Sequence, residues 1–489
     1  MAYIVTLFTA ILLVGAHGSI AIGLTPRVAG SNASHVQTYP IPEDVPVATD
    51  FDLKVRSPGG EWEKIETYRP LHNEINFTTG STVQHASSLA LFDFNGTVEI
   101  QATYTKDQVS NAMVRPQSFD IRPTKSGSTL TFTLTEPRDV VLQVNGNVFD
   151  TLHIFTNLPD TDVPSKDDKG VIYYGPGYHK LSSPIVVGSG ETLYLAGGAV
   201  VSAPDIMVTN SSDVTLRGRG VLYSERGNAM NIRSSNNVLV EGLVGINFFP
   251  RTFEAKDITF RRWRGFSAVQ WGDGLDLYSS RNVLIDSVFL RNSDDCIAIY
   301  NHRDESYGDS VNITIQNSIL WADVAHPINV GTHGNTEDPE TVDGVIIRNI
   351  DILDQREKQM LYQGTIALNA GDSNLIQNVL IEDVRVEDIR LGQLLNFRVM
   401  YNEKWNTSPG RGIRNVLVRN LRYDGRNAGT SIFTGYDEER TISNVTFENL
   451  VVNGLPISDT MQKPGWYLTT DFIPLYANEH VKNLTFKST

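Results

Sequence analysis

Short runs of alternating apolar and polar residues recur along the chain from about residue 190 to its end. Each run starts with Asn, Asp or Gly and ends in a polar stop. Alternation with a period of two predicts β-strands. The runs begin about 20 to 40 residues apart and read DVTLRGR at Asp213, NVLVEGL at Asn237, DITFRRW at Asp257, NVLIDSV at Asn282, NITIQNS at Asn312, GVIIRNI at Gly344, NVLIEDV at Asn378, NVLVRNL at Asn415 and NVTFENL at Asn444.

Similar units of this length, with strands but no helical period between them, indicate a solenoid. We expect an all-β chain in which residues 165–489 form a right-handed parallel β-helix. Inward Val, Ile and Leu side chains then stack from coil to coil, and the Asn residues form amide ladders along the stack. A β-propeller is the alternative, although its blades would need four strands and more even spacing.

Residues 24–160 follow a different pattern. The segments DFDLKVRS, SLALFDF, TVEIQATY, TLTFTLT and DVVLQVNGNVF are short alternating strands separated by turn residues, without the coil formula. This pattern predicts an N-terminal antiparallel β-sandwich domain. The segment TNLPDTDVPSKDDKG reads as a linker, and GVIYYGPGYHKL begins the first coil.

Residues 1–18 are predicted to be a secretory signal peptide, because an apolar stretch ends in small residues with Ala16 and Gly18 at the cleavage signal. No later segment is long and apolar enough to span a bilayer. Eight N-x-S/T sequons also favour a secreted, extracellular glycoprotein with N-linked glycans. They begin at Asn32, Asn76, Asn95, Asn210, Asn312, Asn406, Asn444 and Asn483.

Charge and cysteine content narrow the partners and the source of stability. The net charge is −15, so nucleic acid is disfavoured as a partner. Cys296 is the one cysteine, which excludes an intramolecular disulfide and suits an inward core position. Stability therefore has to come from packing and hydrogen bonding in a chain of 489 residues.

The repeat also serves as a ruler for the acidic residues. Asp273 follows Asp257 by 16 residues, the pair Asp294 and Asp295 follows Asn282 by 12 and 13, and His326 follows Asn312 by 14. Equivalent positions on adjacent coils lie about 4.8 Å apart. The three acids and His326 are therefore expected on one face, across neighbouring coils. Asp276 is interpreted as a turn residue.

Carboxylates on adjacent coils repel one another, so at least one pKa rises and leaves that group protonated. A protonated acid beside an ionised one is what glycosidic hydrolysis requires. Trp263, Trp271, Tyr300 and Trp321 lie near the acids in sequence and are candidates for stacking on sugar rings. The nearby His302, Arg303 and His333 either line the groove or lie in solvated loops. Segments 301–311 and 352–364 are expected to form the walls of the groove.

The order GDGLD, NSDD and AHPINVG resembles three successive motifs of glycoside hydrolase family 28, the polygalacturonases, and the solenoid is also similar to family 49, the dextranases and isopullulanases. The resemblance implies a pectin-lyase-like β-helix, inversion at the anomeric carbon, and no metal or cofactor. It makes Asp294 the general acid, Asp273 and Asp295 the pair that holds and deprotonates water, and His326 a partner that tunes the acid.

The chain departs from family 28 where that family grips the galacturonate carboxylate with an R-I-K motif. The stretch QGTIALNAG puts Thr365, Ile366 and Ala367 there. We therefore expect a neutral α-linked glycan as the polysaccharide or oligosaccharide substrate, with a polygalacturonase-type pectin hydrolase as the alternative. The expected substrate-binding residues are Trp271, Tyr300, Arg303, Trp321, Gln363, Asn369 and Arg398. Arg398 is the nearest later cation and the candidate replacement for the missing uronate-binding Arg and Lys, a role that the sequence leaves open.

Two other functions remain open at this stage. A polysaccharide lyase on the same fold would use the acids to bind Ca²⁺ and a base such as Arg303 to abstract a proton. A non-catalytic carbohydrate-binding solenoid would bind oligosaccharide without releasing reducing ends.

Overall fold

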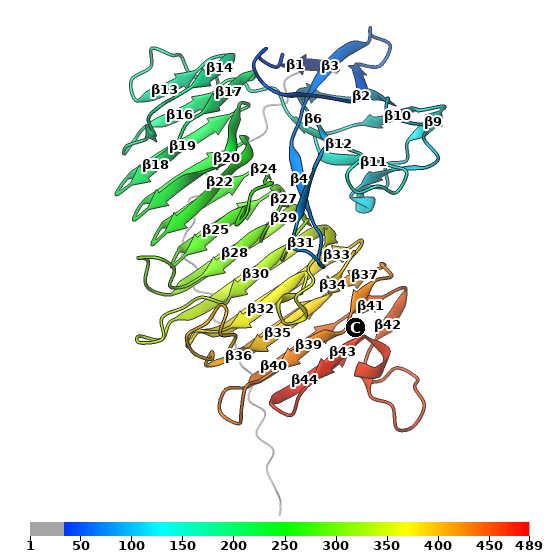
Figure 1. The fold of residues 1–489 in the computed structure, drawn as a ribbon, viewed down its shortest axis with the longest axis vertical. Coiled ribbons are helices and arrows are strands. Elements are labelled where there is room, and N and C mark those ends of the chain that lie inside the picture. Colours follow the sequence, from blue (N-terminus) through cyan, green and yellow to red (C-terminus); the bar gives the residue numbers. More distant parts are fainter. Residues whose placement is uncertain (1–33, 489) are drawn as a thin grey trace, which may run out of the picture. The chain divides into compact units, whose positions relative to one another are not determined.

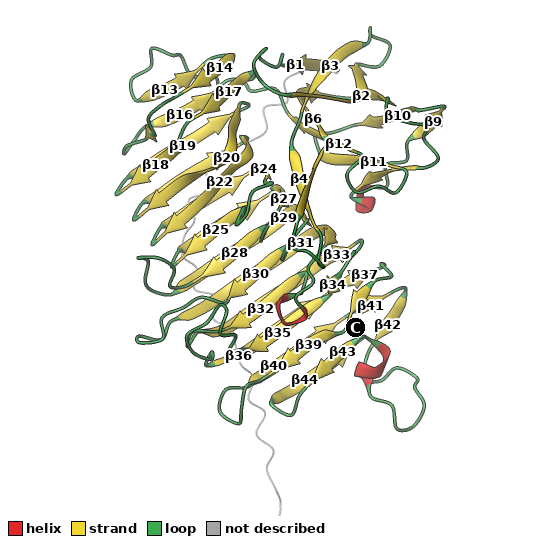
Figure 2. Cartoon of the chain, in the orientation of Figure 1, coloured by secondary structure: helices red, strands yellow, loops and turns green. Residues whose placement is uncertain are grey.

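The computed structural model describes residues 34–488, which are almost entirely strand and loop (Figure 2). Helix in this range is limited to three 3₁₀ turns, η1 (Gln117–Phe119), η2 (Met360–Tyr362) and η3 (Thr469–Phe472). Within the same residues no helix is long and apolar enough to cross a membrane. The predicted signal peptide at residues 1–18 and the sequon at Asn32 lie outside the described residues.

The N-terminal strands form a ten-stranded, mainly antiparallel sheet in the order β8-β11-β12-β6-β3-β2-β7-β10-β9, with β1 paired to β6. All five strands predicted from alternation in this region are present. The bounds are β1 (His35–Thr38), β2 (Val47–Arg56), β3 (Glu63–Tyr68), β6 (Ser88–Asn95), β7 (Val98–Tyr104), β8 (Ala112–Arg115), β9 (Thr124–Ser126), β10 (Thr129–Leu134), β11 (Asp139–Val144) and β12 (Thr151–Asn157).

This sheet encloses its own apolar core, which includes Leu53, Phe92, Ile100 and Leu142. The ten strands are joined in one hydrogen-bonded path rather than in two separate sheets. The β-sandwich and the boundaries 24–160 and 165–489 therefore stay predictions, while the all-β class is confirmed.

A second, two-stranded sheet in this region was missed by the sequence analysis. The strands β4 (Leu71–Ile75) and β5 (Thr82–Ala86) form an antiparallel hairpin that pairs with no other strand. In Figure 1 the hairpin runs from β6 down past β24, β27 and β29 of the following solenoid.

Residues 171–487 form a stack of 30 strands whose neighbouring coils pair in parallel, as a β-helix requires. The first coils contain β13 (Val171–Tyr174), β14 (Gly177–Lys180), β15 (Ile185–Val186), β16 (Thr192–Leu195), β17 (Ala199–Ser202), β18 (Asp205–Thr209), β19 (Ser212–Gly218), β20 (Val221–Arg233), β21 (Asn236–Glu241), β22 (Val244–Phe253), β23 (Lys256–Arg261) and β24 (Arg264–Phe266). As predicted, the first coil starts with GVIYYGPGYHKL.

The central and last coils complete the stack. They contain β25 (Leu275–Tyr278), β26 (Arg281–Asp286), β27 (Phe289–Asn292), β28 (Ile297–Tyr300), β29 (Ser310–Ala322), β30 (Ile328–Gly331), β31 (Thr341–Gln355), β32 (Ile366–Ala370), β33 (Leu375–Val386), β35 (Leu395–Val399), β36 (Gly412–Arg419), β37 (Arg422–Tyr423), β39 (Ser431–Thr434), β40 (Ile442–Glu448), β41 (Leu450–Val452), β42 (Leu455–Ile457), β43 (Leu475–Ala477) and β44 (Val481–Lys487). A separate small pair joins β34 (Gly392–Gln393) and β38 (Ala428–Gly429).

The Asn, Asp or Gly that starts each repeat has a structural cause. These residues adopt a left-handed backbone, for example φ 55° at Asn282, 56° at Asn312 and 73° at Gly344. Only Gly, Asn and Asp adopt that region readily. The predicted amide ladder is also present, because Asn282 Nδ2 donates to Asp257 Oδ1 at 2.8 Å and Asn312 Nδ2 to Asn282 Oδ1 at 3.0 Å.

A third apolar cluster joins the N-terminal sheet to the solenoid. Phe155 of β12 packs against Phe266 and Phe289 of the coils, with ring centroids 5.7 and 4.8 Å away. Buried charges cross the same interface, since Arg264 forms a bidentate pair with Asp139 at 2.9 Å. The hairpin β4–β5 is therefore carried by a unit that is packed firmly on the coils.

Candidate active site

The strand register stacks three of the predicted residues. Leu275 pairs with Ile297, and Ile297 pairs with Ile328, on three successive coils. Asp273, Asp295 and His326 each lie two residues before these positions. The backbone continues the stack, because Gly274 N donates to Asp295 O and Cys296 N donates to His326 O, both at 2.8 Å. The predicted shared face across neighbouring coils is confirmed, and Cys296 is a buried core residue as expected.

Asp295 is the most fully hydrogen-bonded acid of the group. His326 Nδ1 lies 2.6 Å from Asp295 Oδ1, which also accepts the His326 N–H at 3.1 Å. The other oxygen accepts from Asn329 Nδ2 at 2.8 Å, from Tyr300 OH at 3.0 Å and from Tyr362 OH at 3.5 Å. Burial opposes ionisation of Asp295, but the charge of His326 together with the hydrogen bonds from His326, Asn329 and Tyr300 outweighs it and lowers the pKa of Asp295. Asp295 is therefore the ionised carboxylate of the group.

Asp273 behaves in the opposite way. Burial raises its pKa well above the usual value, and the carboxylate of Asp276 raises it further, followed by those of Asp294 and Asp295. A hydrogen bond between Asp273 and Asp276 favours the proton on Asp273.

Asp276 is not the turn residue that the sequence analysis expected. It lies buried in β25, where its Oδ2 accepts from Tyr278 OH at 2.9 Å and lies 3.3 Å from Arg251 Nε. An Arg and a Tyr hold this carboxylate in place, because an unpaired buried charge is costly.

Asp294 is the second acid with a strongly raised pKa. Burial is the main cause, and the neighbouring Asp295 carboxylate is the next. Asp294 Oδ1 accepts the Asp295 N–H at 3.0 Å, which partly offsets the effect. Glu357, on the loop after β31, adds a further negative charge that raises the pKa of Asp294. Two acids with raised pKa values thus lie beside Asp295, whose pKa is lowered.

Asp273 and Asp294 line a cleft of about 770 Å³. The predicted wall segments contribute Arg303 and Asp304 on one side and Glu357, Gln359 and Tyr362 on the other. The cleft is completed by Asn73, Ile75, Gly80, Thr82, Gln84, Arg251, Ala268, Val269, Gln270, Trp271, Tyr278, Ser293, Tyr300, Val324, Ala325, His333, Lys404 and Trp405.

Aromatic side chains form a connected surface in this cleft. Trp271 is 56% exposed and meets Trp405 edge to face at 5.9 Å. Trp405 stacks on Tyr362 at 5.6 Å, and Tyr300 stacks on Tyr278 at 5.9 Å with nearly parallel rings. Such rings offer apolar faces to sugars, while their polar edges hydrogen-bond.

The structure separates the predicted substrate-binding residues into two groups. Trp271, Tyr300 and Arg303 line the cleft. Of the residues left open, His333 also lines it, and burial with the nearby Arg303 lowers its pKa to about 3. His302 instead stacks on Tyr307 at 4.3 Å.

The placement of Trp321 in the cleft was wrong. Its side chain is fully buried in the cluster between the N-terminal sheet and the coils, where the guanidinium of Arg291 lies 3.9 Å from its ring. Trp263 is likewise fully buried, in the solenoid core. Proximity to an acid in the sequence does not place an aromatic ring in the cleft, and both tryptophan rings are buried in apolar clusters instead.

Gln363, Asn369 and Arg398 also do not line the cleft. Gln363 is buried and donates to Glu357 O at 2.6 Å, and Asn369 is buried with its amide on Asn329 Oδ1 at 3.3 Å. Arg398 donates to Leu361 O at 2.5 Å, and burial lowers its pKa. These three side chains support the residues around the cleft, so their assignment as direct contacts is corrected.

The cleft residues that the sequence analysis missed include Arg251, Lys404 and Trp405. They lie on long strands or on loops without alternation, and only the three-dimensional coil places them beside the acids. Tyr278 had a detectable signal, since it occupies the same register position as Tyr300 one coil later. Across residues 34–488, no group of three or more His, Cys, Asp or Glu side chains is arranged to hold a metal ion.

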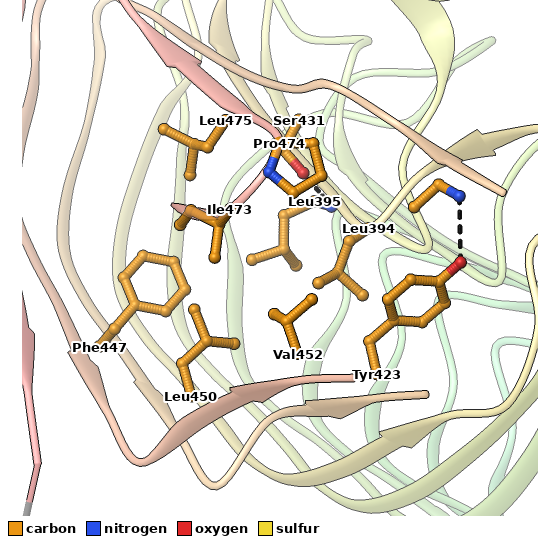
Figure 3. A pocket seen from close by; sticks show the side chains of 11 residues that line it. Leu394, Leu395, Tyr423, Ser431, Phe447, Leu450, Val452, Ile473, Pro474 and Leu475 are labelled. Carbon is orange, nitrogen blue, oxygen red and sulfur yellow. Dashed lines mark hydrogen bonds between the residues drawn. The ribbon is translucent and has the colours of Figure 1, made fainter. Parts of the chain in front are cut away.

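A second pocket lies far along the chain from these acids. Leu394, Tyr423, Phe447 and Ile473 are among its lining residues, which are mostly apolar and converge at the last coils (Figure 3). Its volume is about 20 Å³, which is room for about one water molecule. This pocket is a packing gap between side chains of the last coils.

Comparisons with known proteins agree with the chemistry of the cleft. The sequence model described as glycosyl hydrolases family 28 matches residues 225–404, the segment that contains Asp273, Asp294, Asp295 and His326. The chain is a glycoside hydrolase. A comparison with curated protein sequences finds no match.

One solved structure shares the fold of this glycoside hydrolase, and others are less similar. Dex49A from Penicillium minioluteum is 13% identical and has a TM-score of 0.64, over 92% of this chain and 96% of that one. A family 28 exopolygalacturonase from Yersinia enterocolitica is 11% identical, with a TM-score of 0.47 over 80% and 96% of the two chains. An exopolygalacturonase from Thermotoga maritima is 15% identical, with a TM-score of 0.47 over 59% and 85%.

Proposed function

We propose that this polysaccharide-degrading glycoside hydrolase is a secreted, inverting enzyme that cleaves a neutral α-linked glycan. The observation that carries the proposal is the arrangement of Asp273 and Asp294. Both face one cleft with raised pKa values, beside the ionised Asp295. Inverting hydrolysis needs an acid for the leaving oxygen and a base for water.

Asp294 is the general acid in this proposal. Its raised pKa keeps a proton available near neutral pH, and it faces the cleft, so it protonates the leaving oxygen of the glycosidic bond. The charge of Asp295 directly beside it supports the protonated form. After bond cleavage Asp294 is ionised and takes a proton back from solvent.

Asp273 is the residue that contacts and deprotonates the attacking water. A base with a raised pKa holds the abstracted proton strongly, although it acts only above that pKa. Asp295 does not line the cleft, and both its oxygens accept hydrogen bonds from neighbouring groups. We therefore assign Asp295 the fixed negative charge beside the water site, with His326 as the residue that holds Asp295 ionised.

Two single substitutions test the acid and the base. Asp294→Asn and Asp273→Asn should each lower kcat by about two to four powers of ten with the fold intact. Thermal unfolding measured on both variants controls for the fold. Near-normal hydrolysis by either folded variant would remove that residue from its assigned role.

The stereochemical outcome tests inversion directly. Proton NMR of the first product should show the anomeric configuration opposite to that of the substrate bond. A product with the retained configuration would require a covalent intermediate and would exclude the single displacement by water.

The proposed neutral substrate rests on the missing uronate grip. Thr365, Ile366 and Ala367 are fully buried, so the corresponding position offers no cation to the cleft. A uronate carboxylate without a cationic partner is costly in a partly dry site. Reducing-end release on dextran, pullulan, galactan and polygalacturonate at equal enzyme concentration should be fastest on one of the neutral polymers.

Cleavage of polygalacturonate is the second candidate, because Arg251, Arg303 and Lys404 all line the cleft. Arg251 is already paired with Asp276, which leaves Arg303 and Lys404 as the exposed cations, and Lys404 lies 4.4 Å from the Trp405 ring centre. Polygalacturonate as the fastest substrate, with Arg303→Ala abolishing that preference, would establish this candidate instead.

Secretion is supported by the predicted signal peptide. Expression of the full chain in a eukaryotic secretory host should release enzyme into the medium with its new N-terminus near Ser19. Retention of the enzyme in the cell with Met1 intact would contradict it.

A further inference from the structure

The hairpin β4–β5 reaches from the N-terminal sheet to the catalytic cleft. Five of its residues line the cleft with the acids, although the nearest acid lies almost 190 residues later in the chain: Asn73, Ile75, Gly80, Thr82 and Gln84. We propose that this hairpin is a substrate-binding wall that contacts the sugar residues next to the cleaved bond on the β32 side of the acids. The inference rests on the proposed hydrolysis at Asp273 and Asp294 and identifies a specificity-determining element for it.

The strand pattern of the hairpin divides its side chains between two faces. Asn73 is paired with Gln84, and Ile75 with Thr82, and these two pairs face the cleft. The intervening pair of Glu74 and Val83 points to the other side, as alternation in a strand requires.

The opposite face contacts both the N-terminal unit and the coils, where His72 Nδ1 lies 3.5 Å from Asp323 Oδ2. His85 Nε2 lies 2.8 Å from Glu74 Oε2, and the His85 ring stacks on Phe149 at 3.9 Å. His72 is fully buried and lies 2.7 Å from Ser87 Oγ. One face therefore anchors the hairpin, while the other is left to the cleft.

Both ends of the hairpin are fixed to loops that also line the cleft. Near its base, Gln84 Nε2 donates to Ala268 O at 2.8 Å, on the loop that leads to Asp273. At its tip, Arg356 donates to Ile75 O at 2.8 Å and Lys358 to Phe77 O at 2.7 Å. The Arg356 guanidinium also lies 4.1 Å from the centre of the Phe77 ring.

These two attachments set the length of the wall. Ala268 precedes β25 and Arg356 precedes β32, and the strands between them pair in the sequence β25–β28–β30–β32. Three steps of about 4.8 Å give a wall of about 14 Å along the solenoid axis. Asp273 and Asp294 lie on the first two of these coils, so the wall starts at the acids and extends two further coils toward β32, beside a polysaccharide that follows the groove in that direction.

The chemistry of the cleft-facing side chains defines what they bind. Asn73, Thr82 and Gln84 are neutral hydrogen-bonding groups, and Ile75 adds an apolar contact. Thr82 is exposed, and its hydroxyl makes no side-chain hydrogen bond within residues 34–488. This face offers no charge to a uronate and suits the hydroxyl groups of a neutral glycan.

The test uses neighbouring residues on the two faces of β5. Thr82→Trp places a bulky ring in the cleft, whereas Val83→Trp places the same ring on the opposite face, where Val83 is 53% exposed. Thr82→Trp should raise KM for the preferred polymer by about tenfold or more, with Val83→Trp close to wild type. The mild variant Thr82→Val should raise KM by about 2- to 12-fold with little change in kcat, as the loss of one hydrogen bond predicts.

A second readout separates this inference from the hydrolysis itself. Electrophoretic retardation of each full-length variant in gels containing dextran, pullulan, galactan or polygalacturonate measures binding without turnover. If wild type is retarded by a polymer that it does not cleave, and Thr82→Trp removes the retardation, the hairpin inference stands while the proposed function fails. If Thr82→Trp and Val83→Trp behave alike in both assays, or wild type neither binds nor cleaves any polymer, the hairpin inference is overturned.

Discussion

Replacing Asp276 with Asn should move the acidic limb of the pH–rate profile to lower pH. In the wild-type enzyme the Asp276 carboxylate is the largest charge effect that raises the pKa of Asp273. The Asn side chain removes that charge and has an N–H to donate to the Asp273 carboxylate. Arg251, 3.3 Å from Asp276 in wild type, loses its anionic partner and acts on Asp273 instead.

All three effects favour the ionised form of Asp273, so the substitution lowers the pKa of Asp273. A neighbouring charge shifts a carboxyl pKa by about one to three units, and each unit corresponds to about 1.36 kcal/mol. Because Asp273 has to be ionised to accept the proton of water, the pH of half-maximal kcat/KM on the acidic side should fall by about one to three units.

The assay is kcat/KM between pH 3 and pH 9 on the fastest polymer of the panel, with circular dichroism at each pH. Asp304→Asn is the matched control, since Asp304 also lines the cleft but is exposed and does not contribute to the shift of Asp273. An acidic limb that stays in place or moves to higher pH in folded Asp276→Asn would refute the assignment of Asp273 as the base.

Two further predictions concern stability and glycosylation. Burial lowers the pKa of His72 and His153 well below the usual value, so the folded state keeps both side chains neutral. The free energy of unfolding should therefore be highest above about pH 6.5 and fall by about 1.4 kcal/mol per His for each pH unit below it, because the unfolded chain takes up the protons. Equal urea midpoints at pH 7.5 and 5.5 would contradict this. Mass spectrometry of the secreted protein should find glycan at the exposed Asn95 and Asn210 but not at Asn406, which is buried and donates to a backbone carbonyl, and occupancy of Asn406 in folded enzyme would refute the buried placement.

The coil repeat predicted the fold and the centre of the site for one physical reason. In a parallel stack, a fixed position in the repeat returns to the same place on each coil, so sequence offsets convert into spatial neighbours. Asp273, Asp295 and His326 follow the repeat start by 16, 13 and 14 residues, and the hydrogen bond between His326 and Asp295 shows that these offsets coincide in space.

The offset from the start of the repeat does not tell which side of a strand a residue occupies once a bulge or turn intervenes. Trp321 lies on β29, where the register with β31 shifts between Leu320 and Trp321. Its ring turns toward the N-terminal sheet instead of the groove. Asn369 and Arg398 are register partners on β32 and β35. Arg398 supports the loop at Leu361 and Asn369 supports Asn329, and neither side chain lines the cleft. The polarity of a residue in the sequence therefore could not distinguish side chains that contact the substrate from side chains that hold the residues around the cleft in place.

The hairpin β4–β5 escaped detection for a different reason. A strand with one buried face shows apolar residues at every second position, and that contrast is the signal used to find it. Here one face carries Asn73, Thr82 and Gln84 toward the cleft, and the other carries Glu74 and His85 toward the N-terminal unit. Both faces are polar because each meets polar partners, so the period of two is invisible in hydropathy. The same lack of contrast is what a strand would show if it were selected to bind hydroxyl groups rather than to fill a core, and it is the sequence property that the Thr82 and Val83 variants examine.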